Sequence, residues 1–214
     1  PVDYLEKIFT EAICHPDVAV LSVATRPDCL PDEVLSLLER LNRIKPVWVE
    51  LGLQTIHQPT ADFIHRGYSL FCFESAFFAL KKAGIEVVVH TILGLPGETD
   101  TMIFETMDYL SQIGIDGIKL QLLHVLKDTK LEEIYRAGEY TPLTMAEYVD
   151  LVIGCIERLD PSIVIHRITG DSPHGLLVAP AWSEQKWTIL NTINDTLEKR
   201  GSFQGKNFHS NFIT

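Results

Sequence analysis

A run of β-branched residues that ends in a glycine–proline–glycine turn constrains the fold of this chain more than any other stretch. The run covers Val87–Ile92, the turn covers Gly94–Gly97, and a helical pattern follows. Glycine lets the backbone approach a ligand closely, proline stiffens the bend, and Thr99 or Asp100 can cap the next helix. Such a loop gathers backbone N–H groups at a helix N-terminus, where a ligand can bind. A strand-to-helix turn without any ligand uses the same residues, so this alternative stays open here.

Strand and helix patterns alternate along most of the chain. Strands are predicted at 18–24, 47–51, 85–93, 115–125 and 163–168, and helices at 3–9, 31–43, 59–64, 71–83, 101–113, 131–135, 144–159 and 186–199. This alternation implies parallel strands joined by right-handed crossovers. The strand at 18–24 is almost continuously apolar, which is typical of a strand buried on both faces. Residues 1–201 are therefore expected to form the α/β domain, and 202–214 a loose tail.

Polar residues stand at or near the ends of successive predicted strands. They are Arg26, Gln54 with Thr55, His90, the group Lys119, Gln121 and His124, and His166 with Arg167. On adjacent parallel strands such residues would face one polar cavity. Because no GxGxxG pattern follows any strand, a barrel is favoured over an open doubly wound sheet.

Composition excludes several classes of protein. The four cysteines are scattered without CxxC spacing, so a metal or redox site formed by them alone is not expected, and they fit a reducing cytoplasm. No apolar run is long enough to cross a membrane. The formal net charge of −11 opposes non-specific binding to DNA or RNA.

Short stretches in a particular order and spacing carry a resemblance to a known family. They are Thr25–Asp28, Leu51–Thr55, Arg66–Gly67, His90 with Gly94–Glu98, Gly117–Leu120, Gly138–Pro142 and His166–Ile168. In this combination most of the chain resembles the radical S-adenosylmethionine (SAM) superfamily. It is most similar to iron–sulfur oxidoreductases related to the radical domain of the Elongator catalytic subunit.

The resemblance implies a partial parallel (β/α) barrel of the radical SAM type, which is TIM-barrel-like. It also implies two cofactors, SAM and a [4Fe-4S] cluster held by a CxxxCxxC loop. That loop is absent from this sequence, and Cys29 and Cys72 cannot replace it, because three thiolates must converge on one cluster. The chain is therefore expected to lack the first βα units, with the cluster cysteines upstream. On its own it is expected to be inactive and to contain no metal site.

The resemblance also suggests which residues bind the cofactor. Gln54 and Arg66 would hold the methionyl carboxylate or ribose of SAM, and His90 would contact the ribose. Ile92 and Leu123 would flank the adenine, where Gly94 and Gly97 bring the main chain close. The full set of cofactor-binding candidates is Gln54, Thr55, Arg66, His90, Ile92, Gly94, Gly97 and Leu123.

Several of these residues also fit ordinary structural roles. Arg66 fits a solvated charge at a helix end, His90 a satisfied interior histidine, and Ile92 and Leu123 ordinary core positions.

The substrate-side candidates are Arg26, Lys119, Gln121, His124, His166 and Arg167. Among these, Lys119 is expected to meet Glu50, Asp116 or an anionic ligand, or to extend from the barrel rim, and Arg26 could equally anchor the turn at Pro27.

The function implied by the resemblance is generation of a 5'-deoxyadenosyl radical that abstracts hydrogen from a substrate. Because the Elongator-like domain acts on tRNA, modification of the wobble uridine is the hypothesis for the substrate. Two alternatives remain: a radical SAM oxidoreductase acting on a small molecule, and a non-catalytic barrel that binds a nucleotide or protein. The expected partners are an electron donor such as a flavodoxin or ferredoxin and tRNA, and the expected location is the cytoplasm.

Overall fold

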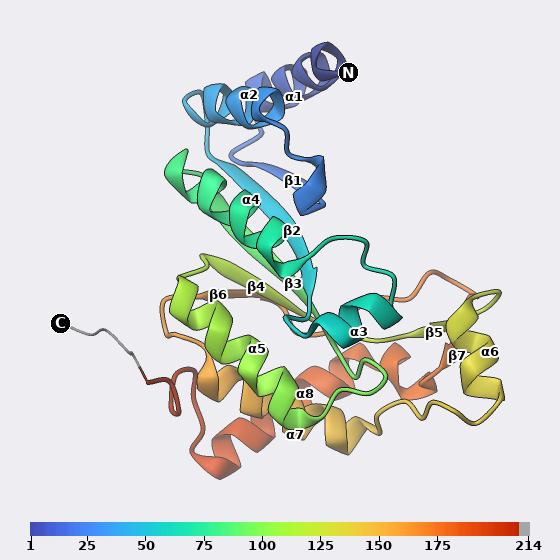
Figure 1. Ribbon diagram of the computed structural model, residues 1–214. Helices are drawn as coiled ribbons and strands as arrows, with labels where there is room; N and C mark the ends of the chain where they lie inside the picture. The colour runs from blue at the N-terminus through green and yellow to red at the C-terminus, as the bar shows by residue number, and fades with distance from the viewer. Residues whose placement is uncertain (210–214) are drawn as a thin grey trace. The chain divides into compact units, whose positions relative to one another are not determined.

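The computed structural model describes residues 1–209 (Figure 1). The helices are α1 (Val2–Cys14), α2 (Asp32–Asn42), α3 (Gln58–Phe63), α4 (Leu70–Lys82), α5 (Asp100–Ile113), α6 (Lys130–Arg136), α7 (Met145–Arg158) and α8 (Lys186–Arg200). The strands are β1 (Leu21–Thr25), β2 (Val47–Gln54), β3 (Glu86–Leu93), β4 (Gly117–Leu122), β5 (Val125–Leu126), β6 (Val164–Arg167) and β7 (Leu177–Ala179). Two short 3₁₀ turns occur at Pro27–Cys29 and Ala181–Glu184.

The strands form a five-stranded sheet in the order β1-β2-β3-β4-β6 and a two-stranded sheet of β5 and β7. β1 and β2 are parallel, with Leu21 opposite Val47 and Thr25 opposite Leu51. The chain divides into two compact units. Unit 1 contains Pro1–His90 with Ile115–Gly117, and unit 2 contains Thr91–Gly114 with the residues from Ile118 onward. The expected alternation of strands and helices is confirmed.

Strand β2 has one buried face and one more open face in unit 1. Burial alternates strictly along β2, with Val47, Val49, Leu51 and Leu53 buried and the intervening residues half-exposed. Strand β2 contacts helices α2 and α4. Within α4, Phe73 and Phe77 stack at 6.1 Å between ring centroids. Because side chains alternate across a strand, Glu50, Gly52 and Gln54 all lie on the opposite, more open face.

The prediction that the first strand is buried on both faces is wrong. β1 is shorter than the predicted 18–24, and Ser22 and Ala24 on one of its faces are exposed. The reason is that β1 pairs with β2 alone among the described residues, so it is the edge strand of the sheet. A continuous apolar run cannot distinguish a central strand from an edge strand.

The predicted strand 115–125 is two strands. β4 ends at Leu122, and Val125 and Leu126 form β5, which pairs antiparallel with β7 in the other sheet. β7 was missed because a strand of three residues, Leu177–Ala179, gives no measurable alternation.

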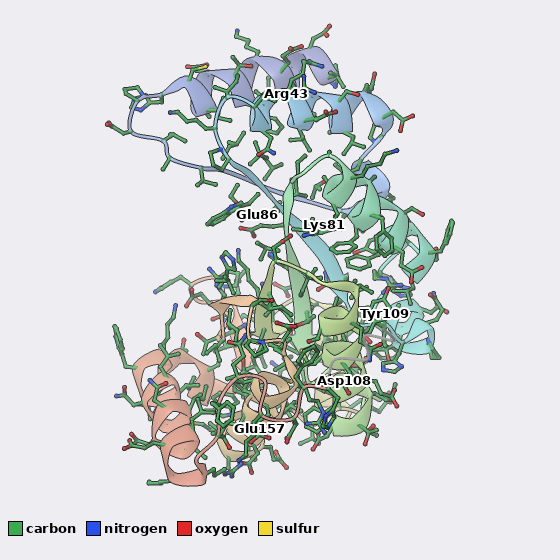
Figure 2. The ribbon with its side chains drawn as sticks, turned by 90° about the vertical axis from the view of Figure 1, so that its left-hand side faces the viewer. Arg43, Lys81, Glu86, Asp108, Tyr109 and Glu157 are labelled. Atoms are coloured by element: carbon green, nitrogen blue, oxygen red, sulfur yellow. The ribbon has the colours of Figure 1, made fainter. Side chains whose placement is uncertain are left out.

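Residues 202–209 do not form the loose tail that was expected. The backbone N–H groups of Gly205 and Asn207 donate to the carbonyls of Ile156 and Glu157 on α7, at 3.2 and 2.7 Å. The Gln204 amide donates to the carbonyls of Asp160 and Ile163. This segment therefore docks on the end of α7, near the Glu157 labelled in Figure 2. The last residues of the predicted tail, 210–214, lie outside the described residues.

Helices α4, α5 and α7 begin at residues whose side chains cap them. Of the two candidates for α5, Thr99 is the cap, and its hydroxyl accepts from the Met102 N–H. Ser69 caps α4 in the same way, and Thr144 with Glu147 forms a capping box on α7. No helix in the described part of the chain is long and apolar enough to cross a membrane.

Candidate functional site

A carboxylate on the open face of unit 1 joins two neighbouring strands. Glu50 on β2 accepts a hydrogen bond from the Ser22 hydroxyl on β1 at 2.9 Å, and its other oxygen lies 2.8 Å from Nε2 of His90 on β3. The Glu50 and His90 side chains are 17% and 23% exposed, so the pair is shielded but can still be reached. His90 was predicted to contact the cofactor, and the structure shows that Glu50 orients its imidazole ring.

Gln54 ends β2 in an unusual backbone conformation. Its φ is +69°, in the left-handed region that residues with a Cβ atom rarely adopt. Such outliers persist only where the surroundings hold them, and they cluster at ligand sites. The side chain is half-exposed and lies on the same face of β2 as Glu50 and Gly52.

Arg66 holds the main chain on both sides of Gln54, in the segment Gly52–Thr55 that we call the Gln54 turn. Nη1 donates to the carbonyls of Leu53 at 3.1 Å and Thr55 at 2.6 Å, and Nε donates to the carbonyl of Tyr68 at 3.0 Å. The residue is only 6% exposed, and burial lowers the pKa of its guanidinium. The alternative of a solvated charge at a helix end is therefore wrong. Nη2 is buried without a hydrogen-bond partner among the described residues, so it is the atom through which Arg66 could contact a ligand.

Thr55 takes part in hydrogen bonds that stabilise the chain after Gln54. Its side chain is 1% exposed, and its hydroxyl accepts from the His57 N–H at 3.1 Å. The contact of Thr55 with a cofactor stays a prediction.

Arg26 anchors a turn in unit 1. Its guanidinium forms a two-pronged ion pair with Asp28, at 2.9 and 2.7 Å, and lies over the Tyr68 ring at 5.3 Å from the centroid. This contact holds the pKa of the Asp28 carboxyl below its usual value. Of the two interpretations of Arg26, the structure supports the turn anchor.

In unit 2, the glycine turn after β3 is shaped by its neighbours in that unit. Gly94 and Gly97 have φ values of +85° and +82°. The Gly94 carbonyl accepts from the Tyr140 hydroxyl at 2.9 Å, and burial raises the pKa of Tyr140 to about 12, so this hydroxyl stays protonated. Tyr140 lies in a stretch that carries the family resemblance, which was the signal that could have singled it out.

Ile92 and Leu123 are half-exposed in unit 2, and the Leu123 N–H donates to the Leu93 carbonyl at 3.0 Å. They are therefore not fully buried core residues, and their contact with adenine stays a prediction. The same holds for the approach of Gly94 and Gly97 to the adenine.

The substrate-side candidates in unit 2 differ in exposure. Lys119 and Gln121 are half-exposed on one face of β4, and His166 and Arg167 are exposed on β6. His124 is half-buried, its Nε2 has no hydrogen-bond partner among the described residues, and burial lowers the pKa of its imidazole. Their contact with a substrate stays a prediction.

Asp116, which the sequence offered as a partner for Lys119, is occupied in unit 1. Its carboxylate accepts from Lys81 Nζ at 2.6 Å and from the Val87 N–H at 2.8 Å. Lys81 extends from α4 and is labelled in Figure 2. This pair fixes the start of β3, so Asp116 has a structural role.

The described residues do not form an iron–sulfur site. Cys14 and Cys29 are exposed, Cys72 is half-buried and Cys155 is buried, and all four thiols are free. Within residues 1–209, no three side chains of histidine, cysteine, aspartate or glutamate are grouped so that they could hold a metal ion.

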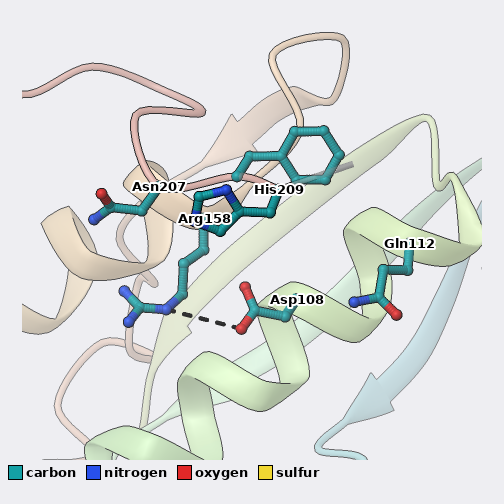
Figure 3. A pocket seen from close by; sticks show the side chains of 6 residues that line it. Asp108, Gln112, Arg158, Asn207 and His209 are labelled. Atoms are coloured by element: carbon teal, nitrogen blue, oxygen red, sulfur yellow. Dashed lines mark ion pairs between the residues drawn. The ribbon is translucent and has the colours of Figure 1, made fainter. Parts of the chain in front are cut away.

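A cavity of about 490 Å³ lies in unit 2 beside α5, α7 and the C-terminal segment (Figure 3). It is lined by Asp108, Gln112, Arg158, Asn207, Phe208 and His209. Arg158 Nε lies 3.9 Å from Asp108 Oδ2, and its guanidinium lies 4.0 Å from the centroid of the Phe104 ring. None of the residues that the sequence singled out lines this cavity.

Comparison with known proteins gives one consistent result. Residues 2–110 match the family described as the radical SAM superfamily, and residues 115–199 match the radical SAM C-terminal domain. The chain is 44% identical over 208 residues to the uncharacterised protein YtqA of Bacillus subtilis, and the match covers 97% of this chain and 65% of that protein. It therefore spans about two thirds of this relative's length.

More distant relatives extend the comparison. The tRNA uridine(34) acetyltransferase of Methanocaldococcus jannaschii is 27% identical over 85% of this chain and 33% of its own length. A solved structure of Elp3 from Methanocaldococcus infernus, with an N-terminal deletion, matches 87% of this chain and 43% of that one, with a TM-score of 0.75 and 22% identity. This match confirms the expected fold class, an α/β fold of the TIM-barrel-like type.

Proposed function

The chain belongs to the radical SAM superfamily, and we propose that the protein is an enzyme that binds SAM and abstracts hydrogen from a substrate. Members of this family use SAM and a [4Fe-4S] cluster as cofactors. When bound, and with one electron from an external donor, these cofactors would supply a 5'-deoxyadenosyl radical. The proposal for this chain rests on the Gln54 turn. Gln54 has a positive φ, and the buried Arg66 that holds the turn has one nitrogen, Nη2, without a hydrogen-bond partner among the described residues.

The residues of unit 1 fit SAM in their chemistry. An amide both donates and accepts, so Gln54 suits the hydroxyl groups of a ribose or a carboxylate. The unpartnered Nη2 of Arg66 offers a charge-assisted donor. Glu50 holds the His90 ring in one orientation, so that its imidazole can contact the ribose. The described residues do not fit the cluster. Its cysteines are proposed to lie in a preceding segment.

For the substrate, we propose the wobble uridine of tRNA. The names of the relatives support this proposal, since one is a tRNA uridine(34) acetyltransferase and another is the Elongator complex protein 3 of Schizosaccharomyces pombe, 29% identical over 162 residues. The net charge of −11 favours a second candidate, a radical SAM oxidoreductase that acts on a small molecule. An electron donor such as a flavodoxin or ferredoxin is the proposed partner in both cases.

Binding to bulk tRNA across a salt series separates the two candidates. If tRNA is the substrate, the full-length protein binds it, and the logarithm of the affinity falls linearly with the logarithm of the salt concentration, because phosphate contacts release counterions. Bovine serum albumin, another acidic protein, serves as the control for non-specific binding. Absent or salt-independent binding would rule out tRNA and leave the small-molecule substrate.

A further inference from the structure

The left-handed conformation of Gln54 requires support from its surroundings, and the described contacts show where this support comes from. Three carbonyls around the turn, those of Gly52, Leu53 and Thr55, accept hydrogen bonds from side chains of unit 1. Arg66 supplies the donors for Leu53 and Thr55. The donor for Gly52 is the hydroxyl of Tyr68, at 3.0 Å. Tyr68 was not among the residues that the sequence singled out.

Tyr68 is itself fixed in place. Two guanidinium groups lie over its ring, that of Arg26 at 5.3 Å and that of Arg66 at 5.1 Å from the ring centroid. Arg26 is held by Asp28, and Arg66 donates to the main-chain carbonyl of Tyr68. Each cation–π contact of this kind is attractive, so the two guanidinium groups favour this position of the ring. Burial also raises the pKa of the Tyr68 hydroxyl, which keeps it protonated as a donor.

The Gln54 side-chain amide and the Tyr68 hydroxyl both lie close to Gly52. A Cβ atom at Gly52 would lie 3.0 Å from the Gln54 amide nitrogen and 3.1 Å from the Tyr68 hydroxyl oxygen. Both groups therefore occupy the space that the missing side chain leaves open. The Gln54 side-chain amide and the Tyr68 hydroxyl therefore lie next to each other beside Gly52.

We propose that Tyr68 is a positioning residue that, together with Arg66, holds the Gln54 turn in the shape that binds SAM. This inference rests on the proposed function. Tyr68 acts on the affinity for SAM through Gln54, and the Tyr68 hydroxyl does not need to touch the ligand. Its effect is therefore coupled to the backbone conformation at position 54.

The test uses the full-length protein with three variants, Tyr68→Phe, Gln54→Gly and the double variant. The measured quantities are the dissociation constant of SAM by calorimetry, with the cluster left oxidised, and the midpoint of urea unfolding. Tyr68→Phe is expected to raise the dissociation constant about three- to tenfold, the effect of one hydrogen bond. It should also lower the unfolding midpoint. On the Gln54→Gly background the midpoint should fall much less, because glycine adopts a positive φ without support.

Tyr148→Phe is the matched control, since the Tyr148 hydroxyl also donates to a carbonyl, that of Ile168 in unit 2. It should lower the midpoint without changing the dissociation constant. The inference is overturned if Tyr68→Phe weakens SAM binding no more than this control. It is also overturned if Tyr68→Phe shifts the midpoint equally on both backgrounds. This second readout needs no SAM, so it tests Tyr68 even if the unchanged protein fails to bind SAM, a result that would overturn the proposed function instead.

Discussion

Replacing Arg66 with methionine is expected to lower the free energy of unfolding by about 3 kcal/mol, because three main-chain carbonyls lose their donors at a largely buried position. Methionine keeps the unbranched aliphatic part of the side chain and carries no charge, so the substitution removes the guanidinium together with its hydrogen bonds. The same variant should lose SAM binding, since the Gln54 turn loses its main support. Urea unfolding and calorimetry with SAM measure the two effects.

Arg43→Met is the control for this substitution. Arg43 is exposed on the surface of unit 1 and pairs with Glu39 one turn away at 2.7 Å. Exposed pairs of this kind contribute little, so this variant should change the free energy of unfolding by less than about 0.5 kcal/mol. If Arg66→Met is as stable as Arg43→Met, the hydrogen bonds of Arg66 do not hold the turn.

Replacing Gly94 with alanine is expected to lower the free energy of unfolding by about 2 kcal/mol. Its φ of +85° is disfavoured for alanine, and the added Cβ would lie 3.1 Å and 3.3 Å from Cδ1 and Cγ of Leu143. Leu143 would have to shift, and the hydrogen bond from Tyr140 to the Gly94 carbonyl would be disturbed.

Gly97→Ala separates the backbone effect from the contact with Leu143. Gly97 has nearly the same φ, +82°, but an added Cβ would meet nothing within 4 Å. This variant should cost about 1 kcal/mol, the strain of the backbone alone. Equal losses of stability in the two variants, measured by urea unfolding, would show that the Leu143 contact contributes nothing.

The sequence predicted the glycine turn well because its signals are local. Val87–Ile92 forms most of β3, Gly94 and Gly97 both take positive φ values, and Thr99 caps α5. Each of these features depends on a few adjacent residues. The helix positions could be predicted for the same reason, because the spacing of apolar residues and the capping residues lie within one or two turns of the helix itself.

The parts that sequence could not predict depend on distant partners. The edge position of β1 depends on what pairs with it, and an apolar run carries no such information. Arg66 was read as a ligand contact, whereas two of its nitrogens bind carbonyls that lie up to 13 residues away. The positive φ of Gln54 could not be predicted, because glutamine rarely adopts this conformation and nothing in the residue type indicates it. Tyr68 was missed because its role depends on contacts with the Gln54 turn and with Arg26, which the sequence does not show.

Cleavage of SAM by the full-length protein is the decisive assay for the proposed radical chemistry. The protein would be reconstituted anaerobically with iron and sulfide, and 5'-deoxyadenosine would be quantified with and without a strong reductant. The proposal predicts 5'-deoxyadenosine only when the reductant is present, and much less of it from the Gln54→Ala variant. A reconstituted protein that holds no cluster and forms no 5'-deoxyadenosine would contradict the proposal and favour a barrel that binds a nucleotide or a protein without catalysis.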